Sequence, residues 1–125
     1  MENIGTIPVL NPATLRMLRK STAGNPAYLA ELFQSFIDDA YELINEIKTS
    51  SAEANYDKFY QAVHTFKGLS ATIGCSRMFE VLKTMDALNK EHDFAKSMEQ
   101  IVWLDEAFSE TTRVIKIDIM PHQEK

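Results

Sequence analysis

The 125-residue sequence contains one cysteine, Cys75, and fewer basic than acidic side chains. One cysteine cannot form an internal disulfide, and it cannot supply the paired cysteines of the common zinc sites. The 13 Lys and Arg residues against 18 Asp and Glu residues give a formal net charge of −5 at neutral pH. This balance argues against a general attraction to nucleic acid or to anionic membranes. We therefore expect neither of these among the binding partners.

Long apolar runs are also missing. No stretch approaches the roughly 18 apolar residues that a membrane-spanning helix needs. The first ten residues contain a glutamate and no basic start, which argues against a signal peptide. A hydrophobic content of 45% in a chain of this length suffices for one core. We expect one cytoplasmic domain over residues 1–125, with an N-terminal arm at 1–10, a helical part from about 11 to 119 and a C-terminal tail at 120–125.

Two Asn-Pro pairs mark the first helix starts. In each pair, at 11–12 and 25–26, an asparagine can cap the helix and the proline occupies the first helical position, where its missing N–H costs nothing. Helices are therefore predicted from about 12 and about 26. In the second, apolar residues recur every three or four positions as far as about Lys48, and the small polar residues at 50–55 predict a loop.

Further caps predict the remaining helices. Asn55 can cap a third helix that ends at Gly74, since glycine readily adopts the left-handed conformation found just past helix ends. Ser76 is expected to cap the next helix almost immediately, and Asp93 the last one. One short and four long helices with short loops predict an all-α fold. The simplest arrangement is an up-down-up-down antiparallel four-helix bundle with a short N-terminal covering helix.

The third predicted helix has two contrasting faces. At about 100° per residue, its core-facing residues fall together on one side. They are Phe59, Ala62, Phe66, Leu69 and Ile73. His64 falls on the opposite side, near Gln61, Lys67 and Gly68. Helical geometry alone therefore predicts that His64 faces outward.

The neighbours of His64 suit a histidine that carries a phosphoryl group. A neutral imidazole is a nucleophile near neutral pH. Lys67 follows by three positions, so its ammonium can offset negative charge on whatever the ring holds. Gly68 leaves the backbone uncovered one turn further on, although glycine costs about 1 kcal/mol against alanine inside a helix. Access to the imidazole is a candidate reason for that cost.

The segment from His64 to Gly74, HTFKGLSATIG, resembles the signature of histidine phosphotransfer (HPt) domains. In that signature a lysine follows the histidine by three positions, a glycine by four and a second glycine by ten, and all these offsets match. The resemblance covers roughly Val9 to Ile115 and includes the segment GNPAYLAELFQSFIDDAYELINEI of the second predicted helix.

The resemblance implies a carrier in a multistep phosphorelay rather than a complete enzyme. His64 would accept a phosphoryl group, through Nε2, from the aspartyl phosphate of one receiver domain and pass it to the aspartate of another. The implied partners are the receiver domains of hybrid histidine kinases and response regulators, and we expect a monomer. The receiver would supply Mg²⁺, so the chain needs no metal or cofactor of its own. Lys67 is expected to neutralise charge, Gly68 to give access and Gln61 to orient the ring or its phosphate.

A transient complex with a receiver requires an accessible apolar surface around the histidine. The candidates are Leu15 and Leu18 on the first predicted helix, Tyr60 and Ala71 beside His64, and Met78 on the following helix. For the aliphatic residues among them, the alternative interpretation is ordinary core packing.

Three other functions fit parts of the pattern. The phospho-accepting domain of a chemotaxis-type histidine kinase resembles this fold and motif but receives its phosphoryl group from a kinase. A module that docks receivers without carrying phosphate would not need His64 and Lys67, yet both are present. A four-helix metal protein would use Glu-x-x-His pairs, and the sequence contains none.

Overall fold

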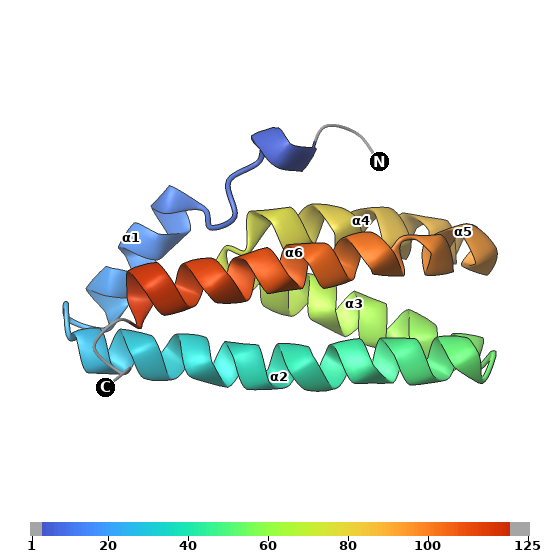
Figure 1. Ribbon diagram of the computed structural model, residues 1–125, viewed down its shortest axis with the longest axis horizontal. Helices are drawn as coiled ribbons and strands as arrows, with labels where there is room; N and C mark the ends of the chain where they lie inside the picture. The colour runs from blue at the N-terminus through green and yellow to red at the C-terminus, as the bar shows by residue number, and fades with distance from the viewer. Residues whose placement is uncertain (1–3, 121–125) are drawn as a thin grey trace.

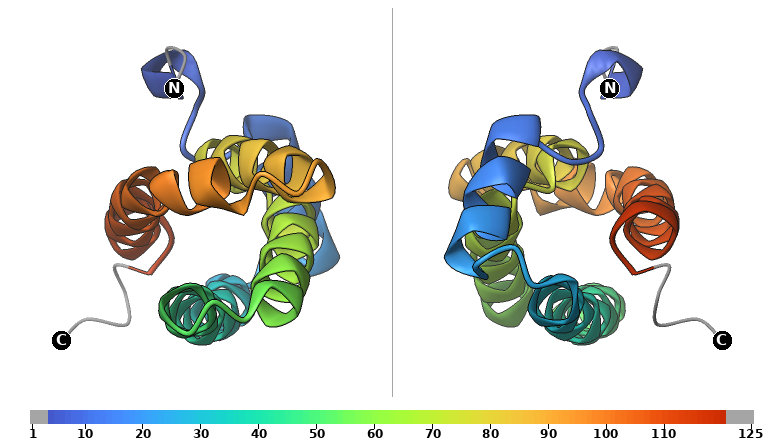
Figure 2. Two further views of the ribbon diagram at one scale, coloured as in Figure 1. Left: turned by 90° about the vertical axis from the view of Figure 1, so that its right-hand side faces the viewer. Right: turned by 90° about the vertical axis from the view of Figure 1, so that its left-hand side faces the viewer.

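The computed structural model describes residues 4–120, and every regular element in that range is a helix. The elements are η1 (Ile4–Thr6), α1 (Pro12–Ser21), α2 (Pro26–Ala52), α3 (Tyr56–Ile73), α4 (Ser76–Lys90), α5 (Phe94–Glu99), α6 (Ile101–Val114) and η2 (Ile115–Ile119). Helices α2, α3, α4 and α6 surround one core, and each packs against its neighbours around the ring (Figure 1, Figure 2). The predicted all-α four-helix bundle is confirmed.

The predicted starts of α1 and α2 are confirmed. The side chain of Asn11 accepts a hydrogen bond from the backbone N–H of Thr14 at 3.0 Å, and Asn25 accepts one from Ala27 at 2.9 Å. The end of α2 was predicted too early, because the helix continues past Lys48 to Ala52. The first of the polar residues that suggested a loop remain helical. Among them, the buried Ser50 donates its hydroxyl to the carbonyl of Glu46, one turn earlier in the same helix.

Helices α3 and α4 meet in a tight turn. Asn55 caps α3 as predicted, and Gly74 ends the helix with φ +82°. The predicted cap of α4 was wrong, because Cys75 occupies the N-cap position and Ser76 is already the first helical residue. The left-handed turn at Gly74 leaves only two residues, Gly74 and Cys75, between the helices. Cys75 is fully buried, and burial raises the pKa of its thiol to about 12, so this side chain is structural.

Helix α1 covers the turn between α3 and α4. The backbone N–H of Asn11 donates to the carbonyl of Gly74 at 2.8 Å. A Cβ atom at Gly74 would lie only 2.7 Å from the Cβ of Thr14. Glycine is therefore required at this position both for its conformation and for the close approach of α1. Helix α1 also contacts α2 and α3, so it is the predicted covering helix (Figure 2).

The last predicted helix is divided in two. Asp93 caps its start as predicted, but α5 ends at Glu99 and α6 begins at Ile101, with Gln100 between them. After α6, a π-helical turn brings Ile119 and Met120 into the core. The predicted tail at 120–125 therefore begins one residue too early, because Met120 is buried. Residues 121–125 lie outside the described range.

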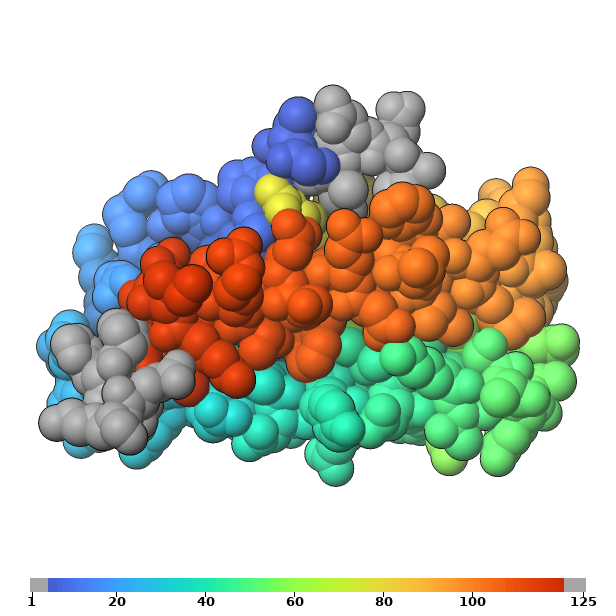
Figure 3. All heavy atoms as spheres, viewed as in Figure 1, coloured from blue at the N-terminus to red at the C-terminus, as the bar shows by residue number. Residues whose placement is uncertain are grey.

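The described part of the N-terminal arm is held by Arg77 of α4. The guanidinium Nε donates to the carbonyl of Ile7 at 2.8 Å and Nη2 donates to that of Gly5 at 3.1 Å. Nη1 lies 3.1 Å from Glu110 Oε2 on α6. The arm therefore lies over α4 beside α6 (Figure 3), and residues 1–3 fall outside the described range. Within residues 4–120, no helix combines the length and apolar character needed to cross a membrane.

Candidate functional site

The two predicted faces of α3 are confirmed. Four of the five predicted core residues are buried and Leu69 is half-buried; the buried ones are Phe59, Ala62, Phe66 and Ile73. The side chain of His64 is 57% exposed. The imidazole therefore lies on the outward side of the helix, where another protein can reach it.

A buried carboxylate lies beside the imidazole. Asp86 of α4 has a side chain only 2% exposed, and its Oδ1 lies 3.4 Å from Nδ1 of His64. Its Oδ2 accepts hydrogen bonds from the ammonium groups of Lys67 at 2.7 Å and Lys90 at 3.0 Å. We call these four residues the Asp86 cluster. A carboxylate this deeply buried needs such partners, because an unpaired buried charge is strongly unfavourable.

The two lysines keep Asp86 ionised. Burial alone raises the pKa of this carboxyl group, but the hydrogen bonds and charges of Lys67 and Lys90 outweigh burial, and the pKa lies below its usual range. The same contact with Asp86 raises the pKa of the Lys90 ammonium. The cluster therefore holds one negative and two positive charges beside His64 at neutral pH.

The carboxylate selects one form of the imidazole. An ionised carboxylate only accepts hydrogen bonds, so the ring nitrogen that faces it carries the proton. With the proton on Nδ1, the other nitrogen, Nε2, keeps its lone pair and is the nucleophilic atom. At 3.4 Å the His64–Asp86 contact is longer than the usual hydrogen bond of about 2.9 Å. Asp86 therefore orients the ring without holding it tightly.

Gly68 leaves open space one turn from His64. A Cβ atom at this position would meet no atom within 4 Å, whereas a Cβ at Gly74 would collide with Thr14. The packing of the described residues therefore does not require glycine at position 68. Glycine costs a helix interior roughly 0.5–1 kcal/mol relative to alanine, and no contact among the described residues accounts for that cost.

Gln61 was predicted to orient the ring or its phosphate. Its side chain is exposed, and in the described part of the chain no hydrogen bond joins it to His64, whose ring is in contact with Asp86 instead. A role of Gln61 toward a bound phosphate stays a prediction.

The predicted docking residues do not all reach the surface. Leu15, Leu18 and Tyr60 are half-buried, and Ala71 is exposed. Met78 was a wrong prediction, because it is fully buried. It lies on the face of α4 that packs into the core.

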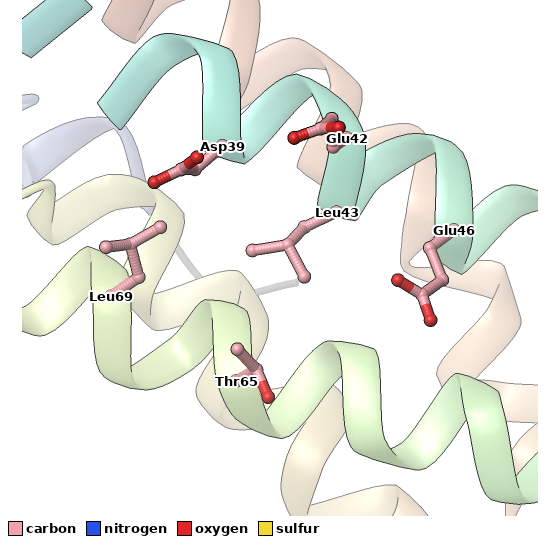
Figure 4. A pocket seen from close by; sticks show the side chains of 6 residues that line it. All are labelled: Asp39, Glu42, Leu43, Glu46, Thr65 and Leu69. Carbon is pink, nitrogen blue, oxygen red and sulfur yellow. The ribbon is translucent and has the colours of Figure 1, made fainter. Parts of the chain in front are cut away.

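A groove of about 420 Å³ lies between α2 and α3. It is lined by Asp39, Glu42, Leu43, Glu46, Thr65 and Leu69, and we call it the α2–α3 groove (Figure 4). Its three carboxylates come from α2, while Thr65 follows His64 directly on α3. Among residues 4–120, no ion pair involves any of these three carboxylates.

Two residues of the Asp86 cluster were missed in the sequence. Asp86 lies on the same side of its helix as Met78, Leu82 and Met85, so it is an acidic residue within an apolar stripe. An acidic residue on a buried face needs a positively charged partner. The position of Asp86 in the apolar stripe was therefore the sequence signal for an ion-paired carboxylate. Lys90 follows four positions later, at the spacing of an ion pair along a helix.

Comparison with known proteins agrees with this geometry. Residues 31–113 match the Hpt domain family. The chain belongs to this family. It is 38% identical over 66 residues to histidine-containing phosphotransfer protein 2 of Oryza sativa subsp. japonica, a match that covers 51% of this chain and 44% of the relative. The match thus spans less than half of that relative's length.

The Hpt fold is also shared with a solved structure. Histidine-containing phosphotransfer protein B from Pseudomonas aeruginosa superimposes with a TM-score of 0.80 at 16% sequence identity. The match covers 92% of this chain and 97% of that one. At this identity the likeness establishes the fold.

In the described residues, His, Cys, Asp and Glu side chains form no group of three that could hold a metal ion.

Proposed function

We propose that this Hpt domain is a phosphocarrier in a multistep phosphorelay. It accepts a phosphoryl group on His64 from the aspartyl phosphate of a receiver domain and passes the group to the aspartate of another receiver. One observation carries the proposal. An exposed imidazole has its Nδ1 facing a buried, ionised carboxylate, so the opposite nitrogen is free to act as a nucleophile.

The proposed step needs little covalent machinery. The Nε2 lone pair attacks the phosphorus, an N–P bond forms, and the P–O bond to the receiver aspartate breaks and leaves a carboxylate. The proton stays on Nδ1, where Asp86 offsets the positive charge that the ring gains. The ammonium groups of Lys67 and Lys90 both contact the Asp86 carboxylate, and they can offset negative charge on the phosphoryl group. Onward transfer is the same step in reverse with a second receiver, so the chain carries the group and catalyses no net reaction of its own.

The partners follow from this chemistry. Receiver domains of hybrid histidine kinases and response regulators would dock on the outward side of α1 and α3, where Leu15, Leu18, Tyr60 and Ala71 offer accessible apolar surface. The receiver would hold the Mg²⁺ ion that the transfer requires. We infer that the domain works as a monomer in the cytoplasm.

The test follows labelled phosphate from receiver to carrier. The wild-type chain and the His64→Gln variant are mixed with a panel of phosphorylated receiver domains and Mg²⁺, and the label is examined after acid and alkali treatment. We expect acid-labile, alkali-stable label on the wild type and none on His64→Gln. Circular dichroism should show the same fold for both, because the side chain is 57% exposed. Label taken only from a kinase with ATP, and from no receiver, would contradict the proposal and favour the acceptor domain of a chemotaxis-type kinase.

A further inference from the structure

Two lysines share one oxygen of the buried carboxylate beside His64. The ammonium groups of Lys67 and Lys90 lie 2.7 Å and 3.0 Å from Oδ2 of Asp86, whereas Oδ1 faces Nδ1 of the imidazole. Among residues 4–120, neither lysine forms an ion pair with any other carboxylate. One cation is enough to balance the charge of one buried carboxylate, so the second lysine calls for an explanation.

The two lysines belong to different helices. Lys67 follows His64 by three positions on α3, and its ammonium group reaches Asp86 across the contact between α3 and α4. Lys90 follows Asp86 by four positions on α4, with the acid before the base, which is the favourable order for an ion pair along one helix. The Lys90–Asp86 pair is therefore internal to α4 and does not depend on the contact between the two helices.

A phosphoryl group on His64 would compete with Asp86 for Lys67. Such a group carries up to about two negative charges at neutral pH, and a flexible ammonium one turn away on the same helix can turn toward it. If Lys67 were the only partner of Asp86, this movement would leave a carboxylate with a 2% exposed side chain unpaired. That state is strongly unfavourable. With Lys90 in place, the carboxylate keeps a cation after Lys67 has moved.

We propose that Lys90 is a positioning residue, which stays on the Asp86 carboxylate while Lys67 turns to the phosphoryl group, so that Asp86 continues to face Nδ1 of His64. The inference rests on the proposed function, because it concerns the phosphorylated state of His64. It gives the two lysines different roles. Lys67 acts on the phosphoryl group directly, whereas Lys90 acts on the imidazole only through Asp86.

A small phosphoryl donor tests this inference without a receiver. Phosphoramidate loads His64 when an N–P bond forms at Nε2, the P–N bond of the donor breaks and ammonia leaves. We expect Lys90→Met to load roughly threefold to tenfold more slowly than the wild type, the usual effect of losing one hydrogen bond. Lys90→Arg keeps the cation and should load at close to the wild-type rate. Lys83→Met is the matched control with unchanged loading, because Lys83 lies on the same helix, is 57% exposed against 53% for Lys90, and pairs with Glu80 instead.

A second background distinguishes positioning from direct contact with the phosphoryl group. In Asp86→Asn there is no carboxylate for Lys90 to hold, so adding Lys90→Met should slow loading by less than about twofold. A lysine that touched the phosphoryl group itself would slow loading by the same factor in both backgrounds. That result would overturn the proposal, and so would wild-type loading rates in Lys90→Met alone.

Nitrogen NMR of the lysine ammonium groups gives a reading that a purely structural role would not change. When phosphoramidate loads the wild type, the Nζ signal of Lys67 should shift clearly more than that of Lys90, and the proton of the imidazole should remain on Nδ1. A larger shift at Lys90 would overturn the proposal. Loading by phosphoramidate without transfer from any receiver would overturn only the proposed function, whereas a wild-type chain that phosphoramidate does not load would overturn both.

Discussion

Helix α3 borders two charged regions that differ in how their charges are stabilised. In the Asp86 cluster, one carboxylate with a 2% exposed side chain is in contact with Lys67, Lys90 and His64. In the α2–α3 groove, three carboxylates lie in or near solvent, and in the described residues none is ion-paired (Figure 4). Water stabilises exposed charges at little cost, whereas a buried charge must be paired by the fold. The cluster is therefore the region where the charges are held in place.

The largest effect is expected at the buried carboxylate itself. Asp86→Asn keeps the volume of the side chain but weakens two charge-assisted hydrogen bonds and removes the charge that faces His64. We expect the unfolding free energy to fall by about 1–2 kcal/mol in urea titrations. Phosphotransfer from a receiver should slow about tenfold in a stopped assay, since about 1.4 kcal/mol of lost transition-state stabilisation has that effect.

Asp105→Asn is the control for this change. Asp105 pairs with Lys48 at 2.9 Å, but the two side chains are 45% and 47% exposed. Its loss should cost no more than about 0.5 kcal/mol and leave transfer unchanged. Equal destabilisation by Asp86→Asn and Asp105→Asn would show that the contribution of an ion pair to stability does not depend on its burial here.

The pH dependence of stability tests the same carboxylate. The pKa of Asp86 is lowered in the folded protein, so its contribution to stability is complete above the unfolded-state value of about 3.9 and is lost as the pH falls through the lower folded-state value. The difference in unfolding free energy between wild type and Asp86→Asn should therefore be largest at neutral pH and shrink in acid. Urea titrations at a series of pH values measure it. A difference that grows in acid would contradict the assigned direction of the shift.

Substitutions of Gly68, which lies next to Lys67 of the Asp86 cluster, should change the stability of the free protein and the rate of phosphotransfer in opposite directions. Because a Cβ atom there meets no neighbour, Gly68→Ala should stabilise the free protein by about 0.5–1 kcal/mol, the usual gain in a helix interior. The same change should slow transfer, and Gly68→Gln should slow it further, because a side chain would obstruct the docked receiver. Urea titration and transfer assays on both variants measure the two effects. Unchanged transfer in Gly68→Gln would remove the proposed access role.

Local sequence patterns predicted much of the fold and only part of the site. Asn11, Asn25, Asn55 and Asp93 marked helix starts correctly because capping depends on residues within one turn. The wheel of α3 placed His64 outward for the same reason. The break at Gln100 carried no such signal, since neither proline nor glycine is present there.

Side-chain contacts between different helices could not be predicted from these local patterns. The contact of His64 with Asp86 joins residues 22 positions apart on two helices, so it depends on how α4 is rotated and shifted against α3. A helical wheel gives directions within one helix and leaves that rotation undefined. For the same reason Met78 was predicted as a docking residue, although the orientation of α4 buries it in the core.

A small effect, in the opposite direction to that of Asp86→Asn, is expected in the groove. Asp39, Glu42 and Glu46 follow one another at three and four positions on α2, a spacing at which like charges repel by about 0.2–0.5 kcal/mol per pair. Combining Asp39→Asn, Glu42→Gln and Glu46→Gln should therefore raise the unfolding free energy slightly, by up to about 0.5–1 kcal/mol at low salt. The gain should vanish near 1 M salt, where charges more than about 3 Å apart are screened. Urea titrations at the two salt concentrations measure the difference. A destabilised triple variant would show that these carboxylates are held by the fold as Asp86 is, and the contrast between the two regions would then fail.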